Sequence, residues 1–593
     1  MFPKLERFKE IWAVDTEYGH RPGDWVQPRC LVARELRTRR TVHWWEDDLA
    51  RFRHPPHNTE ADILFLAYAA NAELGVYLQL GWALPCMILD LFAEFRQITN
   101  GLTLPAGDSL LGALAYFGHT GVDVTEKETM RQLAQHEGPW SQNQRTALLA
   151  YCESDVDALE RLLPSMLPRI DLPRALLRGR YQRAVAAMER RGIPVDVPLR
   201  RRLEKHWGPL QAHLIATVSP SYNYCYSYHH DQAHFQYAPF TEWVTRQGID
   251  WPRTRTGQVS LGDETLKELS TLYPRLVEPF RQLRKSLGQM RIHNMIVGQD
   301  GRNRPSLMPF RSKTGRNQPK TSENILGASA WLRGLIQPTP GTAIFYVDWV
   351  QQEFGIAGVK SNDTRMIEAY CSQDPYMAFA IAAGAVPPEA TKLSHPRERE
   401  IFKICSLGVL YGLSPRGLAR KIGQSLEEGY ELIRQHQHTY PTFWRWLDRA
   451  VHHSFTTGRI STEFGWQLRC FRERSYPHEA TNPRTIRNYP MQALGADMMR
   501  IAACYAVERG VQVCCPVHDA FLCEAPLHKL EEAVATMQQA MSDASAAVLD
   551  GFRLRSDVKV FRHPAHYADG REVATAMWDT VNAFLAHVET TAA

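Results

Sequence analysis

The sequence predicts a multidomain α/β protein, because it is long, has a globular composition and alternates strand-like with helix-like segments. A chain of 593 residues can form several domains, each large enough to bury its own core. Hydrophobic residues make up 44% of the chain and charged residues 22%, as is usual for globular proteins. Short apolar runs that end in polar residues predict strands, whereas apolar residues three and four apart predict helices. The net charge of +5 is small for this length and does not by itself indicate a nucleic-acid partner.

Targeting features of the sequence favour the cytoplasm. The N-terminal segment MFPKLERFKE contains no apolar stretch of the kind found in secretory signals. The most apolar window, residues 74–92, is interrupted by Gln79, Pro85 and Asp90, so we expect it to be buried in a domain rather than in a membrane. Eleven cysteines without paired C-x-x-C spacing indicate reduced thiols. We therefore expect a cytoplasmic protein with no membrane partner.

The N-terminal third contains acidic residues in a pattern that suits metal binding. Residues 11–17, IWAVDTE, predict a buried strand on which Asp15 and Glu17 project from the same face. Residues 148–163 have helical periodicity and place Tyr151 and Asp155 on one face. Three carboxylates could hold two divalent cations that activate water, and a tyrosine could orient that water, as in a two-metal phosphodiesterase. A solvated strand end is the alternative interpretation of the acidic pair taken alone.

The middle of the chain is less informative. Residues 172–196 predict a basic helix that Gly192 and Pro194 end, which indicates a domain boundary. Residues 280–291 predict a helix with several cations, which is either a solvated face or a surface that follows phosphates. In the aromatic segment 222–237, His230 and His234 have the spacing of helical metal ligands, but no carboxylate or C-x-x-C lies near enough to favour zinc.

Residues 397–412 predict one helix with a stripe of functional side chains. Arg399, Lys403, Leu407 and Tyr411 follow one another at four-residue spacing, and Gly412 ends the segment. A four-residue step turns a helix by roughly 400°, so these side chains form a slowly drifting stripe about 18 Å long. Two cations at one end and an aromatic ring at the other suit a nucleoside triphosphate that lies along the helix.

Two aspartates in apolar surroundings could supply the metal site that such a ligand needs. Residues 343–354 begin as a strand that ends at Asp348, and residues 511–525 predict two strands with His518 and Asp519 in the turn between them. Carboxylates with apolar flanks need a partner or a metal. If the strands are neighbours, Asp348 and Asp519 could clamp two magnesium ions against a triphosphate, and Lys403 could protonate the departing pyrophosphate.

Three segments, in order, resemble motifs A, B and C of the family A DNA polymerases, the group of bacterial DNA polymerase I. They are DWVQQEFG from Asp348, R-x-x-x-K-x-x-x-L-G-x-x-Y-G from Arg399, and VHDA ending at Ala520. Two further blocks, KTGRNQP and RTIRNYPMQALGAD, also match, and the resemblance spans residues 180–560. The segments TGRNQP, FGW and PVHDA are similar to segments of polymerases from phages and mobile elements.

This resemblance implies a role for each matching residue. Asp348 and Asp519 would bind two Mg²⁺ ions, and Lys403 would complete the catalytic set. The dNTP would be bound by Arg399, Lys403, Leu407, Tyr411, Gln351 and Glu353, with Glu353 as the gate that rejects a ribose 2′-hydroxyl. The DNA would be bound by Arg316, Arg484, Asn488, Gln492 and His518. Three positions depart from the family pattern: Leu407 replaces an aromatic residue, Ala520 a glutamate and Glu400 an arginine.

The N-terminal segments resemble proofreading 3′→5′ exonuclease domains with a D-E-D-D active site. Asp15, Glu17 and Asp155 would bind two divalent ions, and Tyr151 would belong to the catalytic set. The family has a further aspartate between the two motifs, and Glu73 occupies its position here. The asparagine usually found four residues earlier is replaced by Ala69.

The resemblance also implies the domain order. We expect a ribonuclease H-like exonuclease domain (1–170), a connector (171–196), a thumb region (197–310), the palm with motif A (311–360), the fingers with motif B (361–450), and the palm with motif C and a C-terminal extension (451–593). In this right-hand polymerase the palm would be an antiparallel sheet, and the fingers and thumb would be helical. The expected partners are primer–template DNA and dNTPs in a bacterial host cell. Replication accessory proteins are further candidates, and we expect a monomer.

Several alternatives stay open on sequence alone. One is a DNA polymerase with an inactive exonuclease, or the converse, an exonuclease with a degenerate polymerase. Another is a single-subunit RNA polymerase, which would lack the Gln351–Glu353 gate. A third is a non-catalytic DNA-binding accessory protein, although nothing structural would then require Asp348, Asp519 and Lys403.

Overall fold

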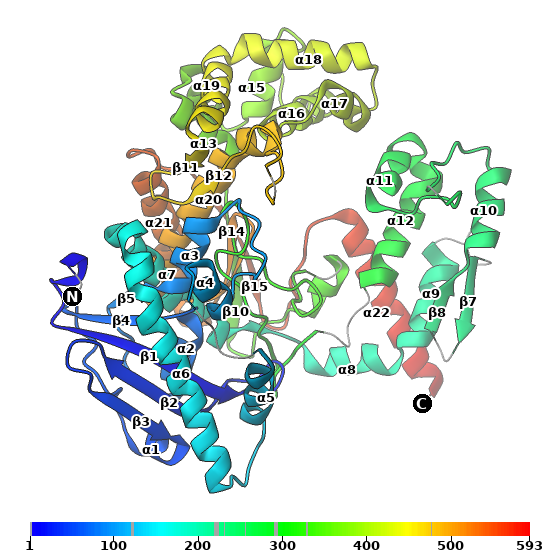
Figure 1. Ribbon diagram of the computed structural model, residues 1–593. Helices are drawn as coiled ribbons and strands as arrows, with labels where there is room; N and C mark the ends of the chain where they lie inside the picture. The colour runs from blue at the N-terminus through cyan, green and yellow to red at the C-terminus, as the bar shows by residue number, and fades with distance from the viewer. Residues whose placement is uncertain are drawn as a thin grey trace.

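Figure 1 shows the computed structural model as an N-terminal α/β unit, a lateral helical region, and a central sheet beneath a layer of helices. The structure describes residues 3–119, 124–218, 225–229, 232–254, 256–289, 295–327, 330–475 and 477–592. Among the described helices, none combines the length and the apolar character needed to span a membrane. All eleven cysteines carry free thiols, and Cys514 and Cys515 are buried, in agreement with a packing role.

The N-terminal unit is built on a five-stranded mixed sheet of order β3-β2-β1-β4-β5. Strands β2 and β3 run antiparallel to their neighbours, whereas β4 pairs with β1, and β5 with β4, in parallel. The strands are β1 (Glu10–Gly19), β2 (Gln27–Glu35), β3 (Thr41–Trp45), β4 (Ile63–Ala67) and β5 (Met87–Asp90). The helices of this unit are α1 (Glu46–Arg51), α2 (Asn71–Leu80), α3 (Leu91–Thr99), α4 (Leu110–Tyr116), α5 (Val124–Ala134) and α6 (Gln142–Met166).

Alternate residues of β1 pack into two different cores. Ile11 and Ala13 belong to the core that contains the apolar face of α6, and Trp12 and Val14 belong to the core that contains α2. Because side chains alternate along a strand, the residues that continue the first set point toward α6. The next of these residues is Asp15, so this register sets the position of the acidic site.

The connector helix α7 (Leu172–Arg191) joins this unit to the rest of the molecule. It contacts β5 and α2 of the N-terminal unit, and also helix α20 (Pro483–Glu508) and strand β13 (Gln512–Val517) of the central part. A Cβ atom at Gly179 would lie 2.0 Å from the carbonyl oxygen of Ile88, so glycine permits this close packing. Gly192, with a φ of 65°, ends the helix at the predicted boundary.

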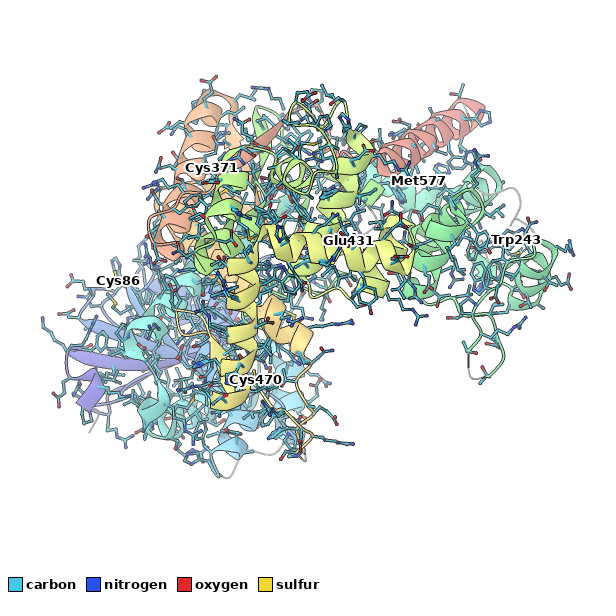
Figure 2. The ribbon with its side chains drawn as sticks, turned by 90° about the horizontal axis from the view of Figure 1, so that it is seen from above. Cys86, Trp243, Cys371, Glu431, Cys470 and Met577 are labelled. Carbon is cyan, nitrogen blue, oxygen red and sulfur yellow. The ribbon has the colours of Figure 1, made fainter. Side chains whose placement is uncertain are left out.

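The lateral region, on the right of Figure 1, is mostly helical. It contains α8 (Val197–Lys205), α9 (Trp207–Val218), α10 (Tyr237–Arg246), α11 (Asp263–Leu272), α12 (Pro274–Gln289) and the hairpin β7 (Tyr226–His229) and β8 (Gln232–Phe235). In Figure 2, Trp243 of this region and Cys86 of the N-terminal unit lie at opposite ends of the molecule.

Two expectations for this region change. The prediction that His234 lies on a helix is wrong, because it lies in strand β8 of a hairpin. His230 lies outside the described residues. The cationic helix is present as α12, but Arg281 pairs with Glu278 at 3.3 Å and the Arg284 guanidinium lies 4.7 Å from the ring centre of Phe235. These contacts favour a local packing role for both arginines. Arg291 of the same segment lies outside the described residues.

The central sheet has the order β13-β14-β10-β15, and its three pairings are all antiparallel. Its strands are β10 (Thr342–Trp349), β13 (Gln512–Val517), β14 (Ala520–Pro526) and β15 (Ser556–Arg562). Helices α20 (Pro483–Glu508) and α21 (Leu530–Val548) pack with it, and α22 (Glu572–Ala592) returns to contact α9. The strands on which Asp348 and Asp519 were expected to meet are therefore neighbours.

A layer of helices follows β10 and lies at the top of Figure 1. It contains α13 (Gln352–Ser361), α14 (Thr364–Cys371), α15 (Pro375–Ala382), α16 (Pro396–Leu410), α17 (Pro415–Ile422), α18 (Leu426–Thr439) and α19 (Pro441–Thr457). A small hairpin, β11 (Arg459–Ser461) and β12 (Gln467–Arg469), leads from it back to α20. Helix α16 confirms the helix expected from the 397–412 pattern, with Tyr411 as its C-cap.

Candidate active sites

Three carboxylates of the N-terminal unit form a compact cluster. Asp15, Glu17 and Asp155 each offer an oxygen, and these oxygens lie within 4.8 Å of one another. Asp15 and Glu17 come from β1, and Asp155 comes from the face of α6 that packs on that strand. Oxygen ligands at this separation suit a hard divalent cation such as Mg²⁺. We refer to these residues as the N-terminal acid cluster.

The electrostatics of Asp15 also fit a cation. Burial raises the pKa of Asp15 well above its usual range, and the charges of Asp155, Glu17 and Glu73 raise it further. Its Oδ2 atom is buried without a hydrogen-bond partner among the described residues. A buried carboxylate that is surrounded by like charges is costly to ionise unless a cation neutralises it.

Glu73 and Tyr151 lie beside the N-terminal acid cluster, as the sequence suggests. Glu73 is in the first turn of α2 and is only 4% exposed. Burial raises its pKa well above the usual range, and nearby Asp90, Glu17 and Asp155 act in the same direction. Burial, followed by the charge of Asp155, raises the pKa of the Tyr151 phenol, which keeps it protonated at neutral pH. Glu73 is not among the three residues whose oxygens lie closest together.

A cleft of about 750 Å³ opens beside this cluster, and it is lined by residues from both the N-terminal unit and the rest of the chain. Glu189 of α7, which sequence reasoning missed, lies on its wall. Its carboxylate accepts hydrogen bonds from Asn71 Nδ2 at 3.1 Å and from the Leu307 backbone N–H at 2.7 Å. No spacing rule could have found Glu189, because its partners lie more than a hundred residues away on either side.

Asp348 and Asp519 are brought together by the antiparallel pairing of β10 with β14. Asp348 pairs in register with Ala520, and the Trp349 N–H donates to the Asp519 backbone carbonyl at 3.3 Å. Burial raises the pKa of Asp348 to about 7, with Asp519 and Asp557 adding to the effect. Burial likewise raises the pKa of Asp519. Because Asp348 Oδ1 is buried and has no hydrogen-bond partner in the described part of the chain, a cation fits this position as well.

Asp557 was also missed by sequence reasoning. It lies on β15 in register with Asp348, on the side opposite to Ala520. Residues paired directly across a sheet project from the same face, so Asp557 places a third carboxylate next to Asp348. Polar and apolar residues alternate along DVKV, residues 557–560, which predicts a strand. The sequence does not show that this strand pairs with β10.

The two cations of α16 are held by acidic neighbours. Arg399 Nε donates to Asp374 Oδ2 at 2.5 Å, and the Arg399 guanidinium lies 5.5 Å from the ring centre of Tyr376. Lys403 Nζ lies 3.2 Å from a carboxylate oxygen of Glu400. Glu400 is the residue that replaces a family arginine, so this departure supplies the partner of Lys403. Leu407 is partly buried on the same helix.

Glu353 is the centre of a polar cluster. The sequence predicted its members in separate motifs and did not predict their contacts with one another. Its Oε1 accepts a hydrogen bond from the Tyr411 hydroxyl at 2.7 Å and another from Gln492 Nε2. Arg316 Nη2 lies 3.9 Å from the same oxygen. Gln351 lies apart from this cluster, where it caps α13 and contacts Arg555 at 3.4 Å. Burial raises the pKa of Glu353, although Tyr411 and Arg316 oppose this effect.

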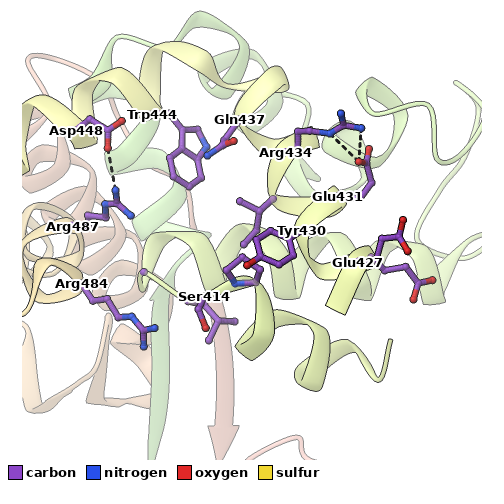
Figure 3. Close-up of a pocket in the computed structure, with 15 residues that line it drawn as sticks. Ser414, Glu427, Tyr430, Glu431, Arg434, Gln437, Trp444, Asp448, Arg484 and Arg487 are labelled. Carbon is purple, nitrogen blue, oxygen red and sulfur yellow. Dashed lines mark hydrogen bonds and ion pairs between the residues drawn. The ribbon is translucent and has the colours of Figure 1, made fainter. Parts of the chain in front are cut away.

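Three of the predicted DNA contacts line two other cavities. Arg316 and His518 line a cavity of about 440 Å³ beside α20. Arg484 lines a larger cavity of about 930 Å³ between α17, α18, α19 and α20, together with Tyr430 and Trp444 (Figure 3). Asn488 lies one turn beyond Arg484 on α20, and its Oδ1 has no hydrogen-bond partner among the described residues.

Comparison with known proteins identifies similar sequences and folds. A family model described as DNA polymerase family A matches residues 241–561. A thermostable DNA polymerase I of Thermus filiformis is 25% identical over 419 residues, covering 65% of this chain and 48% of that protein. DNA polymerase I of Aquifex aeolicus is 26% identical over 418 residues, covering 67% of this chain and 69% of its own length. The chain thus spans about half the length of the Thermus filiformis relative.

A solved structure extends the likeness to the fold. The POL domain of Pol1 from M. smegmatis, in complex with a DNA primer-template and dNTP, matches with a TM-score of 0.72. The match covers 94% of this chain and 95% of that one at 19% sequence identity. At this identity the likeness establishes a similar fold and nothing about individual residues.

Proposed function

The chain belongs to DNA polymerase family A, and we propose that it extends the 3′ end of a DNA primer with dNTPs along a template strand. The observation that carries this proposal is the meeting of Asp348, on β10, with Asp519, in the turn that leads into the adjacent strand β14, each with a pKa raised by burial. Carboxylates in that state gain most from a bound divalent cation. Primer–template DNA and dNTP are present in the similar M. smegmatis structure, which supports the choice of substrates.

We propose that Asp348 and Asp519 hold the magnesium ions of this site. When bound, the ions would stabilise negative charge on the attacking and leaving oxygens. Arg399 and Lys403 would bind the triphosphate, and Lys403 would donate its proton to the departing pyrophosphate. Both cations must first leave Asp374 and Glu400. These ion pairs are partly exposed, so a triphosphate can compete for the cations at little cost.

Glu353 would act as the sugar gate. Its carboxylate is fixed by Tyr411 and Gln492, so it cannot move aside easily to admit an extra hydroxyl. Arg316, Gln492 and His518 would contact the primer terminus from the minor groove. Hydrogen-bond acceptors there are shared by all correct base pairs, so these contacts test pair geometry rather than sequence. Arg484 and Asn488 would also contact the DNA.

We further propose that the N-terminal acid cluster is a 3′→5′ exonuclease site. The separation of its three carboxylates within 4.8 Å supports two-metal hydrolysis, with Tyr151 orienting the water and Glu73 as an additional acid. On this proposal residues 1–170 form the exonuclease domain and 171–196 the connector. The thumb region is 197–310, the fingers are 361–450, and the palm consists of 311–360 and 451–593. We also propose that the protein is a polymerase of the phage or mobile-element type, because TGRNQP, FGW and PVHDA are similar to segments of such polymerases.

A primer-extension assay with Mg²⁺ tests the proposal. A labelled primer on a longer template should lengthen with dNTPs, stay unextended with rNTPs, and shorten when nucleotides are omitted. Extension with rNTPs would favour an RNA polymerase instead. DNA binding without extension would favour an accessory protein. Extension without shortening in the absence of nucleotides would indicate an inactive exonuclease.

A further inference from the structure

The C-terminal end of α3, in the N-terminal unit, is fastened to the segment that carries Arg316. Asn100, the C-cap of α3, is 2% exposed. Its Nδ2 donates to the backbone carbonyls of Lys313 at 2.6 Å and Gln467 at 2.7 Å. Its own backbone carbonyl accepts from the Arg469 N–H at 2.9 Å. Both amide hydrogens of this side chain are therefore used across the boundary between the two parts of the molecule.

A second residue of α3 supports the same loop, residues 310–316. Arg96 Nη2 donates to the Arg311 carbonyl at 2.8 Å, and Arg96 Nε lies 3.4 Å from the Phe310 carbonyl. Arg311 in turn contacts both carboxylate oxygens of Asp108 at 2.7 Å. The N-terminal unit thus holds the 310–316 loop at Phe310, Arg311 and Lys313.

The loop is closed tightly enough to transmit this support to Arg316. The Arg316 N–H donates to Ser312 Oγ at 2.8 Å, and the Gly315 N–H donates to the Ser312 carbonyl at 3.0 Å. Gly315 has a φ of +76°, and a Cβ atom there would lie 2.9 Å from the ring of Trp466. Trp466 Nε1 donates to the Lys313 carbonyl, the same acceptor that Asn100 uses. A displacement of Lys313 therefore moves the backbone of Arg316.

The N-terminal end of α3 is tied to the acid-bearing helix α2. Asp90 caps α3 by accepting from the Phe92 N–H at 2.9 Å, and it also accepts from the Ala69 N–H at 2.9 Å. Ala69, with a φ of +67°, lies just before α2, which carries Glu73. Helix α3 consequently spans from the neighbourhood of the N-terminal acid cluster to the 310–316 loop.

We infer that Asn100 is a positioning residue for primer binding, which acts through Lys313 on Arg316. The inference rests on the proposed DNA polymerase activity and extends it, because it makes the N-terminal unit a structural part of the primer site. Loss of Asn100 Nδ2 would remove one donor from each of two part-buried backbone carbonyls. The Lys313 carbonyl would then keep Trp466 Nε1 as its side-chain donor, and the Asn100 tether between the N-terminal unit and the 310–316 loop would be lost. Loss of a hydrogen bond away from solvent costs more free energy than loss of an exposed one. We expect the 310–316 loop to shift so that its carbonyl groups find other partners.

Steady-state extension kinetics with four variants test the inference. Asn100→Ala should raise the KM for primer–template about five- to tenfold and change kcat by less than about twofold. Gln97→Ala is the matched control. Gln97 is on the same helix end and its Nε2 donates across the same boundary at 2.8 Å, but to Gly465 rather than to the 310–316 loop. Its KM should stay within about twofold of wild type.

The remaining variants, Arg316→Ala and the double variant Asn100→Ala/Arg316→Ala, report on the route. If Asn100 acts through Arg316, the double variant should have the same KM as Arg316→Ala, because coupled residues are not additive. Additive losses, or a wild-type KM for Asn100→Ala, would overturn the inference. If Asn100→Ala does not fold, Asn100→Ser keeps one donor and should give a smaller rise in KM, whereas no rise would overturn the inference. A wild-type protein that does not extend primers would instead refute the proposed activity.

Discussion

The two acidic sites differ in how complete they are before any substrate arrives. In the N-terminal acid cluster, Asp15, Glu17 and Asp155 already lie within 4.8 Å of one another. At the central sheet, Asp348 and Asp519 are adjacent, but Arg399 and Lys403 are bound to Asp374 and Glu400. To complete its metal site, the N-terminal acid cluster therefore needs only divalent cations. The central site also needs a substrate that displaces Arg399 and Lys403 from their acidic partners.

This difference follows from where the charges originate. One strand and one packed helix supply the N-terminal acid cluster, so the core on that face of β1 fixes all three carboxylates. The central site combines a sheet with a separate helix, α16, whose partly exposed cations pair with acidic residues at the end of α15 and on α16 itself. A site whose elements do not share one core can change its composition when one of them moves, whereas β1 and α6 are held together by a common core. The predictions below test this contrast.

The largest effect should come from removing one aspartate of either site. Asp348→Asn should reduce primer extension by about 10³-fold or more while shortening of the primer stays within about twofold of wild type. Asp15→Asn should do the reverse. Primer length is measured by gel electrophoresis with and without dNTPs. Loss of both reactions in either variant would contradict two separate sites.

Leu407→Phe should give the next largest effect. An aromatic ring at this point of the α16 stripe would stack on the incoming base, and such stacking contributes about 1–3 kcal/mol in single-strand binders. The KM for dNTP should therefore fall by about fivefold or more. The control is Leu393→Phe, the same change at a position that is 85% exposed. Unchanged nucleotide affinity and rate in Leu407→Phe would contradict this role.

A smaller effect is expected when Lys403 is released from its partner. Glu400→Gln removes the charge that holds Lys403, so the KM for dNTP should fall about two- to threefold at low salt. Because both groups are partly exposed, the gain should disappear at about 0.5 M salt. Glu398→Gln removes an equal charge from the same helix and serves as the control. An equal fall in both variants would indicate a general change of the local field rather than release of Lys403.

The sequence predicted the elements of both sites better than their partners. Period-two and period-four spacing placed Asp15 with Glu17 and Tyr151 with Asp155, and both pairs lie beside one another in the fold. The strand that carries Asp348 and the two strands on either side of Asp519 were likewise predicted, and β10 does pair with β14. These successes share a cause. The spacing of side chains along one strand or helix, and a carboxylate within an apolar run, can both be recognised from a few consecutive residues.

The missed features depend on contacts between distant segments. Asp557 faces Asp348 only because β15 joins the edge of β10, and Asn100 reaches Lys313 across two hundred residues of chain. The pairing of Arg399 with Asp374 was missed because Asp374 caps a different helix, α15. The His230–His234 spacing misled because His234 lies in a strand, β8, and not in a helix. The periodicity of a sequence segment predicts the helix or strand that it forms, but it does not predict which other segment packs against that helix or strand.

The smallest predicted effect concerns the stability of the protein without metal. Burial raises the pKa of Asp348 to about 7 from 3.8, so the folded state binds a proton that the unfolded state has lost over this range. The free energy of unfolding should therefore decrease as the pH rises toward and through 7, and Asp348→Asn should remove this contribution. With a chelator present, the variant should melt about 1–2 °C above wild type near pH 8 and no higher near pH 5. Added Mg²⁺ should reverse the order near pH 8, because both proteins keep the N-terminal acid cluster but only wild type keeps the Asp348 carboxylate for a cation at the central site. A melting difference that is independent of both pH and Mg²⁺ would show that Asp348 is not the buried, cation-seeking acid of the central site.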